Sequence, residues 1–308
     1  MTLQHLYEEF SAEKELQGLS VESIKDYKYH ILRFLRYVGF YMDYRYLTKD
    51  IVDSYILSLL HDSKISRNTA ATYVRNAKIF LCWIYDNYDL SFNPYKIKYL
   101  KTPKKNVHIY NAAEIKMIFD SMHNSCLWLE ARNKAMVAIM LDSGVRQSEV
   151  RTLLKLNIDF DCHILKVTGK GAKDRFVSVG NYSMQLLNEY FTLCPFGNAE
   201  YVFVDRYGNQ LTRNAVQLFI NRLKHRTGID ITAHKLRHNY ATNFCIDNLQ
   251  LYGNTNVYDL SILMGHESIE TTKKYEHFAH ELVAVNNNIS HLDIVFESIN
   301  EKPKSVYL

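Results

Sequence analysis

The chain has 308 residues, of which 47% are hydrophobic and 23% are charged, a composition typical of a globular protein with about two domains. Its longest purely apolar run, Ala135–Leu141, is far shorter than the ~18–20 residues that cross a bilayer, and the N-terminus has no secretory signal pattern. Five scattered cysteines without a CxxC pair argue against a disulfide framework and a zinc ribbon, so we expect a cytoplasmic protein without membrane contact.

The first hundred residues are predicted to form helices. Apolar residues recur at helical spacing after cap-like residues at Ser20, Thr48 and Ser66. A proline then ends the helical pattern, and a short basic segment, Lys101–Lys105, follows it. We therefore predict an N-terminal helical domain over residues 1–100, a basic linker over 101–108 and a second domain over 109–308.

The positive charge of the chain is concentrated in one segment. Residues 64–105 contain nine Lys or Arg against two Asp or Glu, whereas residues 1–63 are acidic and residues 106–308 are balanced. Such a surplus is typical of a surface that binds phosphates, although a solvated helix face followed by a polar linker would give the same count. The candidate binding residues in this segment are Arg67, Arg75, Lys78, Lys101, Lys104 and Lys105.

The second domain is predicted to mix helices with a little β-structure. Two short β-prone runs, 163–168 and 175–179, flank the glycine-containing turn Gly169–Asp174 and predict a hairpin. A further short strand is predicted at Tyr201–Val204. Helices are predicted at about 112–122, 129–142, 146–155, 182–193, 212–227, 235–247 and 256–264, and again from residue 268 onward.

One candidate for phosphate binding lies in Ser143–Glu149. A glycine turn places Arg146 at the start of a helix, and a guanidinium presents its donors in a rigid fork that matches phosphate oxygens. Glu149 lies three residues further on, on the same helix face, where it can hold this arginine in place. Taken alone, such an arginine is more often an ordinary surface residue.

A second candidate lies in His234–His238. His234 and Arg237 stand one helical turn apart on one side of a helix. His234 and His238 have the spacing of a zinc pair, but the position that a metalloprotease fills with its general base is Lys235. A cation beside a divalent metal is unfavourable, so we predict no metal site here.

Together these segments resemble the tyrosine site-specific recombinases, the family of phage integrases and Xer-type recombinases. The family's motifs occur in order as Gly144–Glu149, Thr168–Arg175, His234–His238, Met264–Ser268 and a tyrosine nine residues after His266. The resemblance covers nearly the whole chain. It implies six catalytic residues, Arg146, Lys170, His234, Arg237, His266 and the nucleophile Tyr275, with Glu149 as a supporting acid.

The resemblance also implies the fold and the reaction. The fold is expected to be mainly α with a small β-sheet, with an N-terminal helical core-binding (SAM-like) domain and a C-terminal α/β catalytic domain. The Tyr275 phenol is expected to attack a scissile phosphate of duplex DNA and form a 3′-phosphotyrosyl link. Because two arginines and a lysine supply positive charge, we expect no metal and no cofactor.

The expected partners are double-stranded DNA with paired recombination half-sites and further copies of the chain. After Tyr275, an apolar stripe at helical spacing predicts a C-terminal helix that passes to a neighbouring protomer in a tetramer; its residues are Leu282, Val285, Ile289, Leu292, Phe296 and Ile299. The alternative is a helix that packs on its own domain.

The sequence leaves the biological role of the protein open between several alternatives. We expect a nucleoid-associated recombinase of bacterial, phage or mobile-element origin, which serves as the integrase or excisionase of a mobile element. A Xer-like chromosome-dimer resolvase and a DNA invertase are the alternatives within the same chemistry. A DNA-binding regulator without activity and a metal-dependent hydrolase that uses His234 and His238 are the alternatives outside it.

Overall fold

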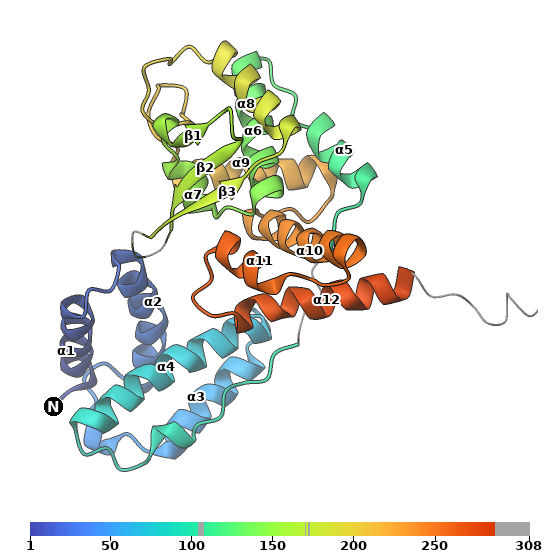
Figure 1. The fold of residues 1–308 in the computed structure, drawn as a ribbon. Helices are drawn as coiled ribbons and strands as arrows, with labels where there is room; N and C mark the ends of the chain where they lie inside the picture. The colour runs from blue at the N-terminus through green and yellow to red at the C-terminus, as the bar shows by residue number, and fades with distance from the viewer. Residues whose placement is uncertain (104–107, 170, 172, 287–308) are drawn as a thin grey trace, which may run out of the picture. The chain divides into compact units, whose positions relative to one another are not determined.

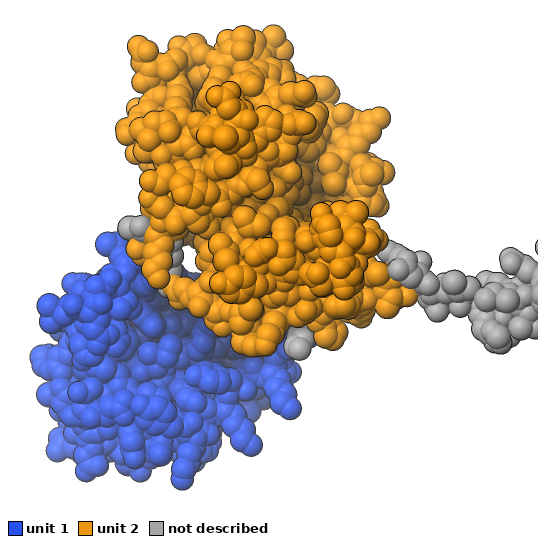
Figure 2. Space-filling view, in the orientation of Figure 1, with its two compact units in different colours: residues 1–105 blue, residues 106–308 orange. Residues whose placement is uncertain are grey.

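The computed structural model describes residues 1–103, 108–169, 171 and 173–286. The chain divides into two compact units, Met1–Lys105 and Asn106–Leu308, which Figure 2 colours separately. The predicted linker at 101–108 spans this division. Three of the predicted site residues, Lys104, Lys105 and Lys170, and the predicted tail beyond residue 286 lie outside the described residues.

The first unit is helical, as predicted. It contains α1 (Leu3–Leu16), α2 (Val21–Val38), α3 (Lys49–His61) and α4 (Arg67–Asn87), together with the short 3-10 turns η1 (Tyr44–Tyr46) and η2 (Pro94–Lys96) (Figure 1). The predicted caps Ser20, Thr48 and Ser66 each accept a backbone N–H from the first turn of their helix. Aromatic side chains fill the core between the four helices, with Phe10, Phe34, Tyr55 and Phe80 almost fully buried.

The second unit combines helices with a three-stranded antiparallel sheet. Its helices are α5 (Ala112–Asp120), α6 (Leu127–Ser143), α7 (Gln147–Thr152), α8 (Asn181–Leu193), α9 (Arg213–Thr227), α10 (Ala233–Tyr252), α11 (Val257–Met264) and α12 (Glu270–Asn286), and it has one 3-10 turn, η3 (Lys155–Asn157). The sheet has the order β1 (Ile158–Asp159), β2 (Ile164–Thr168), β3 (Asp174–Ser178). The expectation of a mainly helical fold with a small sheet is confirmed.

The predicted hairpin is present, and the predicted strand at Tyr201–Val204 is wrong. Strands β2 and β3 pair from Ile164 opposite Ser178 to Thr168 opposite Asp174. Residues 201–204 make only isolated bridges, one through Tyr201 and one through Val204. Because the segment is buried, its apolar run reflects packing in the core, and a short apolar run alone cannot distinguish a strand from other buried chain.

Helix α6 is the buried centre of the second unit. Residues 135–140 are all nearly inaccessible to solvent, so the helix has no polar face there, and it contacts both α8 and α10. It ends at Gly144, whose φ of 62° is left-handed. A Cβ at this glycine would lie 2.2 Å from the ring of Tyr240, so both the turn and the space require glycine. This turn directs the following residues toward α10 and α11.

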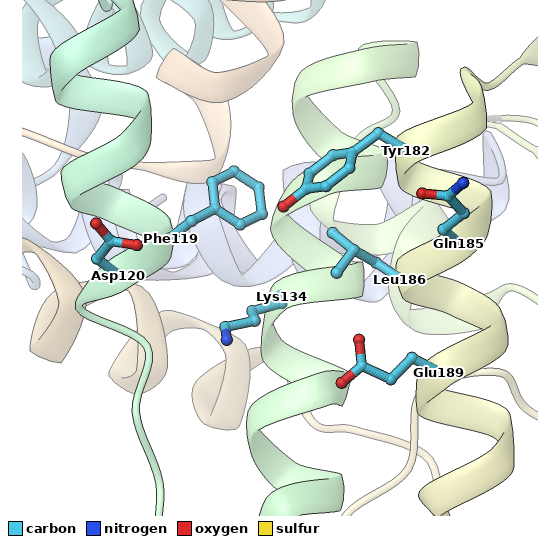
Figure 3. Close-up of a pocket in the computed structure, with 7 residues that line it drawn as sticks. All are labelled: Phe119, Asp120, Lys134, Tyr182, Gln185, Leu186 and Glu189. Carbon is cyan, nitrogen blue, oxygen red and sulfur yellow. The ribbon is translucent and has the colours of Figure 1, made fainter.

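A surface pocket of the second unit lies between α5, α6 and α8 (Figure 3). Phe119 and Tyr182 face each other at 6.1 Å between ring centroids, and Lys134 and Glu189 line the pocket further along. None of the predicted catalytic residues lines it. Among the described helices, none is long and apolar enough to cross a membrane.

Candidate active site

Arg146 is held in place by contacts on two sides. It is the N-cap residue of α7, and its Nη1 donates to Glu149 Oε1 at 2.8 Å. Its Nη2 donates to the carbonyl oxygen of Gly265 at 2.7 Å, which fixes the guanidinium against the loop after α11. Glu149 is thus in contact with Arg146, at the position that the helical spacing of the two residues predicts. The arginine side chain remains about one-third exposed, so it can still reach a ligand.

Glu149 is a buried carboxylate shared by two arginines. Its side chain is only 1% exposed, and it also accepts the backbone N–H of Arg146 at 2.6 Å. Arg175, at the start of β3, donates to both of its oxygens at 2.7 and 2.8 Å. Burial alone would raise the pKa of Glu149, but the hydrogen bonds and charges of Arg175 and Arg146 hold that pKa below its usual value. The carboxylate therefore stays ionised and anchors both guanidinium groups.

Arg175 joins the hairpin to the rest of the site. Besides binding Glu149, its Nε donates to the carbonyl oxygen of Leu263, near the end of α11, at 2.7 Å. A Cβ at Gly265 would lie 3.2 Å from Arg175 Nη1, so the chain passes close to this guanidinium. Arg175 thus ties β3, α7 and the end of α11 together. In the sequence, Arg175 is seen only as the last residue of the hairpin motif.

Arg237 supplies a second buried guanidinium from α10. It is 5% exposed and donates to the carbonyl oxygens of Gly144 and Met264, each at 2.5 Å. Burial and the nearby Arg146 charge lower its pKa to about 10, which still leaves it positively charged at neutral pH. Arg146 and Arg175 thus bind the carboxylate of Glu149, and the charge of Arg237 lies close enough to interact with it. The excess positive charge favours binding of an anion.

His266 lies in the loop between α11 and α12 and is neutral. Burial, together with the positive charge of Arg237 and Arg146, lowers its pKa to about 4. Its Nδ1 is 2.8 Å from the hydroxyl oxygen of Thr272, a fully buried residue on α12. If the hydroxyl donates to Nδ1, the other nitrogen of the ring carries the proton and is a hydrogen-bond donor. Sequence analysis did not identify Thr272.

Tyr275 lies on α12 beside this histidine. Its ring is nearly parallel to that of His266, at 12° and 6.4 Å between centroids. The side chain is 5% exposed, and burial raises the pKa of its phenol to about 12. Among the described residues, none is hydrogen bonded to its hydroxyl group. The phenol is thus protonated at neutral pH and needs help to act as a nucleophile.

Two histidines of α10 complete the site. The Nε2 atoms of His234 and His238 lie 2.7 Å apart, and the His238 ring lies 5.2 Å from the ring of Tyr275. No group of three His, Cys, Asp or Glu suited to hold a metal is found in the part of the chain that the structure describes. The structure brings together five of the six predicted catalytic residues, Arg146, His234, Arg237, His266 and Tyr275, whereas Lys170 lies outside the described residues.

The basic residues of the first unit have different surroundings. Arg75 is exposed on α4, as a residue that binds a ligand needs to be. Arg67 donates to the carbonyl oxygen of Lys101 at 2.9 Å. Lys78 donates to two carbonyl oxygens, those of Tyr95 and Ile97, at 3.0 and 2.7 Å. Arg67 and Lys78 thus hold the segment after α4 against that helix.

The chain resembles known proteins along most of its length. Residues 109–281 match the sequence model of the phage integrase family. Tyrosine recombinase XerC of Lacticaseibacillus casei (strain BL23) is 28% identical over 256 residues, which cover 79% of this chain and 83% of that protein.

Solved structures have the same fold. An integrase of the transposon Tn1549, in complex with a circular intermediate DNA, has a TM-score of 0.73 at 15% identity and covers 98% of this chain and all of that one. The XerH site-specific recombinase, bound to a palindromic difH substrate in a post-cleavage complex, has a TM-score of 0.71 at 20% identity, over 90% of this chain and 82% of that one.

Proposed function

We propose that this chain, which belongs to the phage integrase family and is a tyrosine recombinase, exchanges strands between two duplex DNA sites as the integrase of a mobile element. The observation that carries the proposed chemistry is the cluster of cationic side chains beside a buried tyrosine. Arg146 and Arg237 bind carbonyl oxygens of the turn that leads to His266, and the ring of the neutral His266 lies beside that of Tyr275. This set can hold a phosphodiester next to a nucleophilic hydroxyl.

In the proposed reaction the Tyr275 oxygen attacks the scissile phosphorus and the bond from phosphorus to the 5′-oxygen breaks. The phenol releases its proton to solvent water as the bond to phosphorus forms, and the leaving 5′-oxygen takes up a proton, for which Lys170 is the proposed donor. The products are a 3′-phosphotyrosyl link and a free 5′-hydroxyl. Since the link retains a phosphoester bond, the reverse attack by another 5′-hydroxyl rejoins DNA without an external energy source.

Positive charge in the site stabilises the transition state of this reaction. Arg146 and Arg237 are oriented by carbonyl oxygens of the turns at Gly144 and Gly265 before any substrate binds. Negative charge that develops on the non-bridging oxygens then meets fixed donors, so little reorganisation is needed. His266 donates a further hydrogen bond. Because this charge is supplied by side chains, cleavage should persist in excess chelator.

The role of a Xer-like chromosome-dimer resolvase is the second candidate. The relative reported above is named tyrosine recombinase XerC, whereas the family's description refers to phage integrases. The two roles differ in the DNA that is recombined. A plasmid carrying the sequence that flanks the gene should recombine at the ends of the element if the protein is an integrase, and a chromosomal site near the replication terminus should recombine if it is a resolvase.

We also propose that the protein works as a tetramer on paired half-sites. The support is the apolar stripe that begins at Leu282 and Val285 of α12, of which Val285 is 69% exposed. Deletion of residues 287–308 leaves the described part of α12 intact. The truncated protein should bind one half-site with unchanged affinity but fail to pair two sites. A truncated protein that unfolds as a monomer would show that the tail packs on its own domain.

The covalent step is tested with a nicked suicide substrate that traps the protein–DNA adduct. Tyr275→Phe should bind the DNA site as the wild type does and form no adduct. The matched control is Tyr258→Phe, because Tyr258 lies on α11 in the same unit and is 69% exposed. An adduct that persists in Tyr275→Phe would place the nucleophile elsewhere, and loss of cleavage in chelator with rescue by zinc would favour a metal-dependent hydrolase.

A further inference from the structure

His238 is a buried histidine that the proposed mechanism does not use. It lies on α10 and is only 7% exposed, and its Nε2 approaches Nε2 of His234 at 2.7 Å. Its other nitrogen, Nδ1, is buried and has no hydrogen-bond partner within the described structure. Since a buried polar atom without a partner is uncommon, the arrangement limits which nitrogen can carry the proton.

The two histidines admit two tautomer arrangements when both are neutral. In one, His238 carries its proton on Nε2 and donates to His234, which leaves a bare acceptor at the buried Nδ1 of His238. In the other, His234 donates and the proton of His238 lies on the buried Nδ1, which then is a donor without an acceptor. An orphaned buried N–H is the rarer and more costly of the two, so the first arrangement is favoured.

We propose that His238 is a positioning residue that donates from Nε2 to His234 and thereby holds His234 with its proton on Nδ1. His234 is exposed, and its Nδ1–H is then the group that meets the DNA phosphate or the tyrosine. In this state His234 is a hydrogen-bond donor, and its lone pair at Nε2 is occupied. The inference rests on the proposed function, in which Tyr275 attacks a DNA phosphate.

The surroundings of the pair oppose its protonation. The charged and titratable side chains that face it are Arg237 on the same helix, Lys274 on α12 and His266 after α11. Burial and the positive charges of Lys274 and Arg237 lower the pKa of both His234 and His238. The pair therefore remains neutral at physiological pH, and the hydrogen bond between its members decides the tautomer of His234.

The same contact reaches the nucleophile. The His238 ring packs at 5.2 Å and 53° against the ring of Tyr275, and Nε2 of His238 is already engaged by His234. A substitution at this position therefore changes both the packing of α12 and the proton on His234. The experiment has to separate these two effects, which the choice of variant and the pH dependence allow.

The test compares His238→Gln with His238→Phe in the full-length protein, and it measures adduct formation on the suicide substrate between pH 5.5 and pH 8.5. The glutamine amide can place an N–H near the position of the lost Nε2–H, so this variant should stay within about threefold of the wild type. Phenylalanine keeps the ring and removes the donor, so adduct formation at pH 8 should fall by about tenfold, as expected for the loss of one hydrogen bond.

The pH dependence distinguishes a donor from a base. Protonation of a histidine makes both ring nitrogens donors. The rate of His238→Phe relative to wild type should therefore rise as the pH falls toward the lowered pKa of His234, because a charged His234 regains its Nδ1–H. A ratio that falls with decreasing pH would show that His234 acts as a base and would overturn the proposal, as would a ratio that does not change.

A direct readout uses histidine labelled with ¹⁵N in the wild-type protein. The nitrogen shifts of His234, assigned by comparison with His234→Gln, should report a protonated Nδ1 and a bare Nε2. The opposite pattern would refute the proposal without any variant at His238. Failure of the proposed function is a separate result: it would appear as a wild-type protein that forms no adduct or as an adduct that persists in Tyr275→Phe.

Discussion

Replacement of Glu149 by glutamine should destabilise the second unit strongly. The Glu149 side chain is 1% exposed, and that of Arg175, which binds both of its oxygens, is 10% exposed. The substitution keeps the shape but removes the charge and turns one acceptor into a donor that faces a guanidinium. Removal of one partner from a buried ion pair costs about 3–5 kcal/mol, since the other charge stays buried and uncompensated. For a unit of about 200 residues this corresponds to a decrease in Tm of roughly 6–20 °C.

The chain offers a specific assay for this loss. Its two tryptophans are Trp83 in the first unit and Trp128 in the second. In a Trp83→Phe background the fluorescence of Trp128 reports urea unfolding of the second unit alone. The matched control is Glu267→Gln, an exposed carboxylate in the loop before α12, which should change the free energy of unfolding by less than about 0.5 kcal/mol.

A double-mutant cycle tests the assignment to Arg175. Arg175→Met removes the other partner, and the two substitutions together should destabilise less than the sum of the single effects, by about 1–3 kcal/mol. The pH adds a sign. Because the pKa of Glu149 is lowered in the folded state, its contribution is present above the unfolded pKa of about 4.3 and is lost as the pH falls below it. A loss below about 1 kcal/mol in Glu149→Gln, or additive effects in the cycle, would refute this account of the carboxylate.

Three further outcomes are expected. Thr272→Val removes the hydroxyl 2.8 Å from Nδ1 of His266 and should slow adduct formation about tenfold, whereas Thr271→Val, at an exposed neighbour, should not; equal rates would mean that the hydroxyl does not orient the ring. Burial and nearby positive charges lower the pKa of His238 to about 3 in the folded state, against about 6.5 in the unfolded state. Below pH 6.5 the unfolded state therefore binds a proton that the folded state does not, and stability falls toward acid by up to ~1.4 kcal/mol per pH unit. In urea titrations, the free energy of unfolding of His238→Phe should depend on pH with a slope smaller by about one proton. Arg75→Glu should weaken DNA binding and reduce the slope of log K against log salt by about 0.9 per lost phosphate contact. The control is Arg36→Glu, at an exposed residue outside the basic segment, which should leave the slope nearly unchanged. The same slope in both variants would place Arg75 away from DNA.

The resemblance of its motifs to a known family indicated the candidate catalytic residues, and local patterns in the sequence predicted the helices and the hairpin. Those features depend on neighbours in the chain: a cap such as Ser66 acts on its own first turn, and helical spacing decides which face is apolar. The strand at Tyr201–Val204 was predicted wrongly for the same reason, because a short apolar run does not reveal whether a partner strand lies beside it.

Which side chains contact the candidate catalytic residues depends on how distant parts of the chain pack together. Arg175 is 26 positions from Glu149, and Arg237 is 93 positions from the carbonyl of Gly144 that it binds. No local pattern encodes such pairs, because they form only when α6, α10, α11 and β3 pack around one point. The same holds for the charge states: His238 is an ordinary histidine in the sequence, and its neutral state arises from burial among Arg237 and other cations that the fold brings to it.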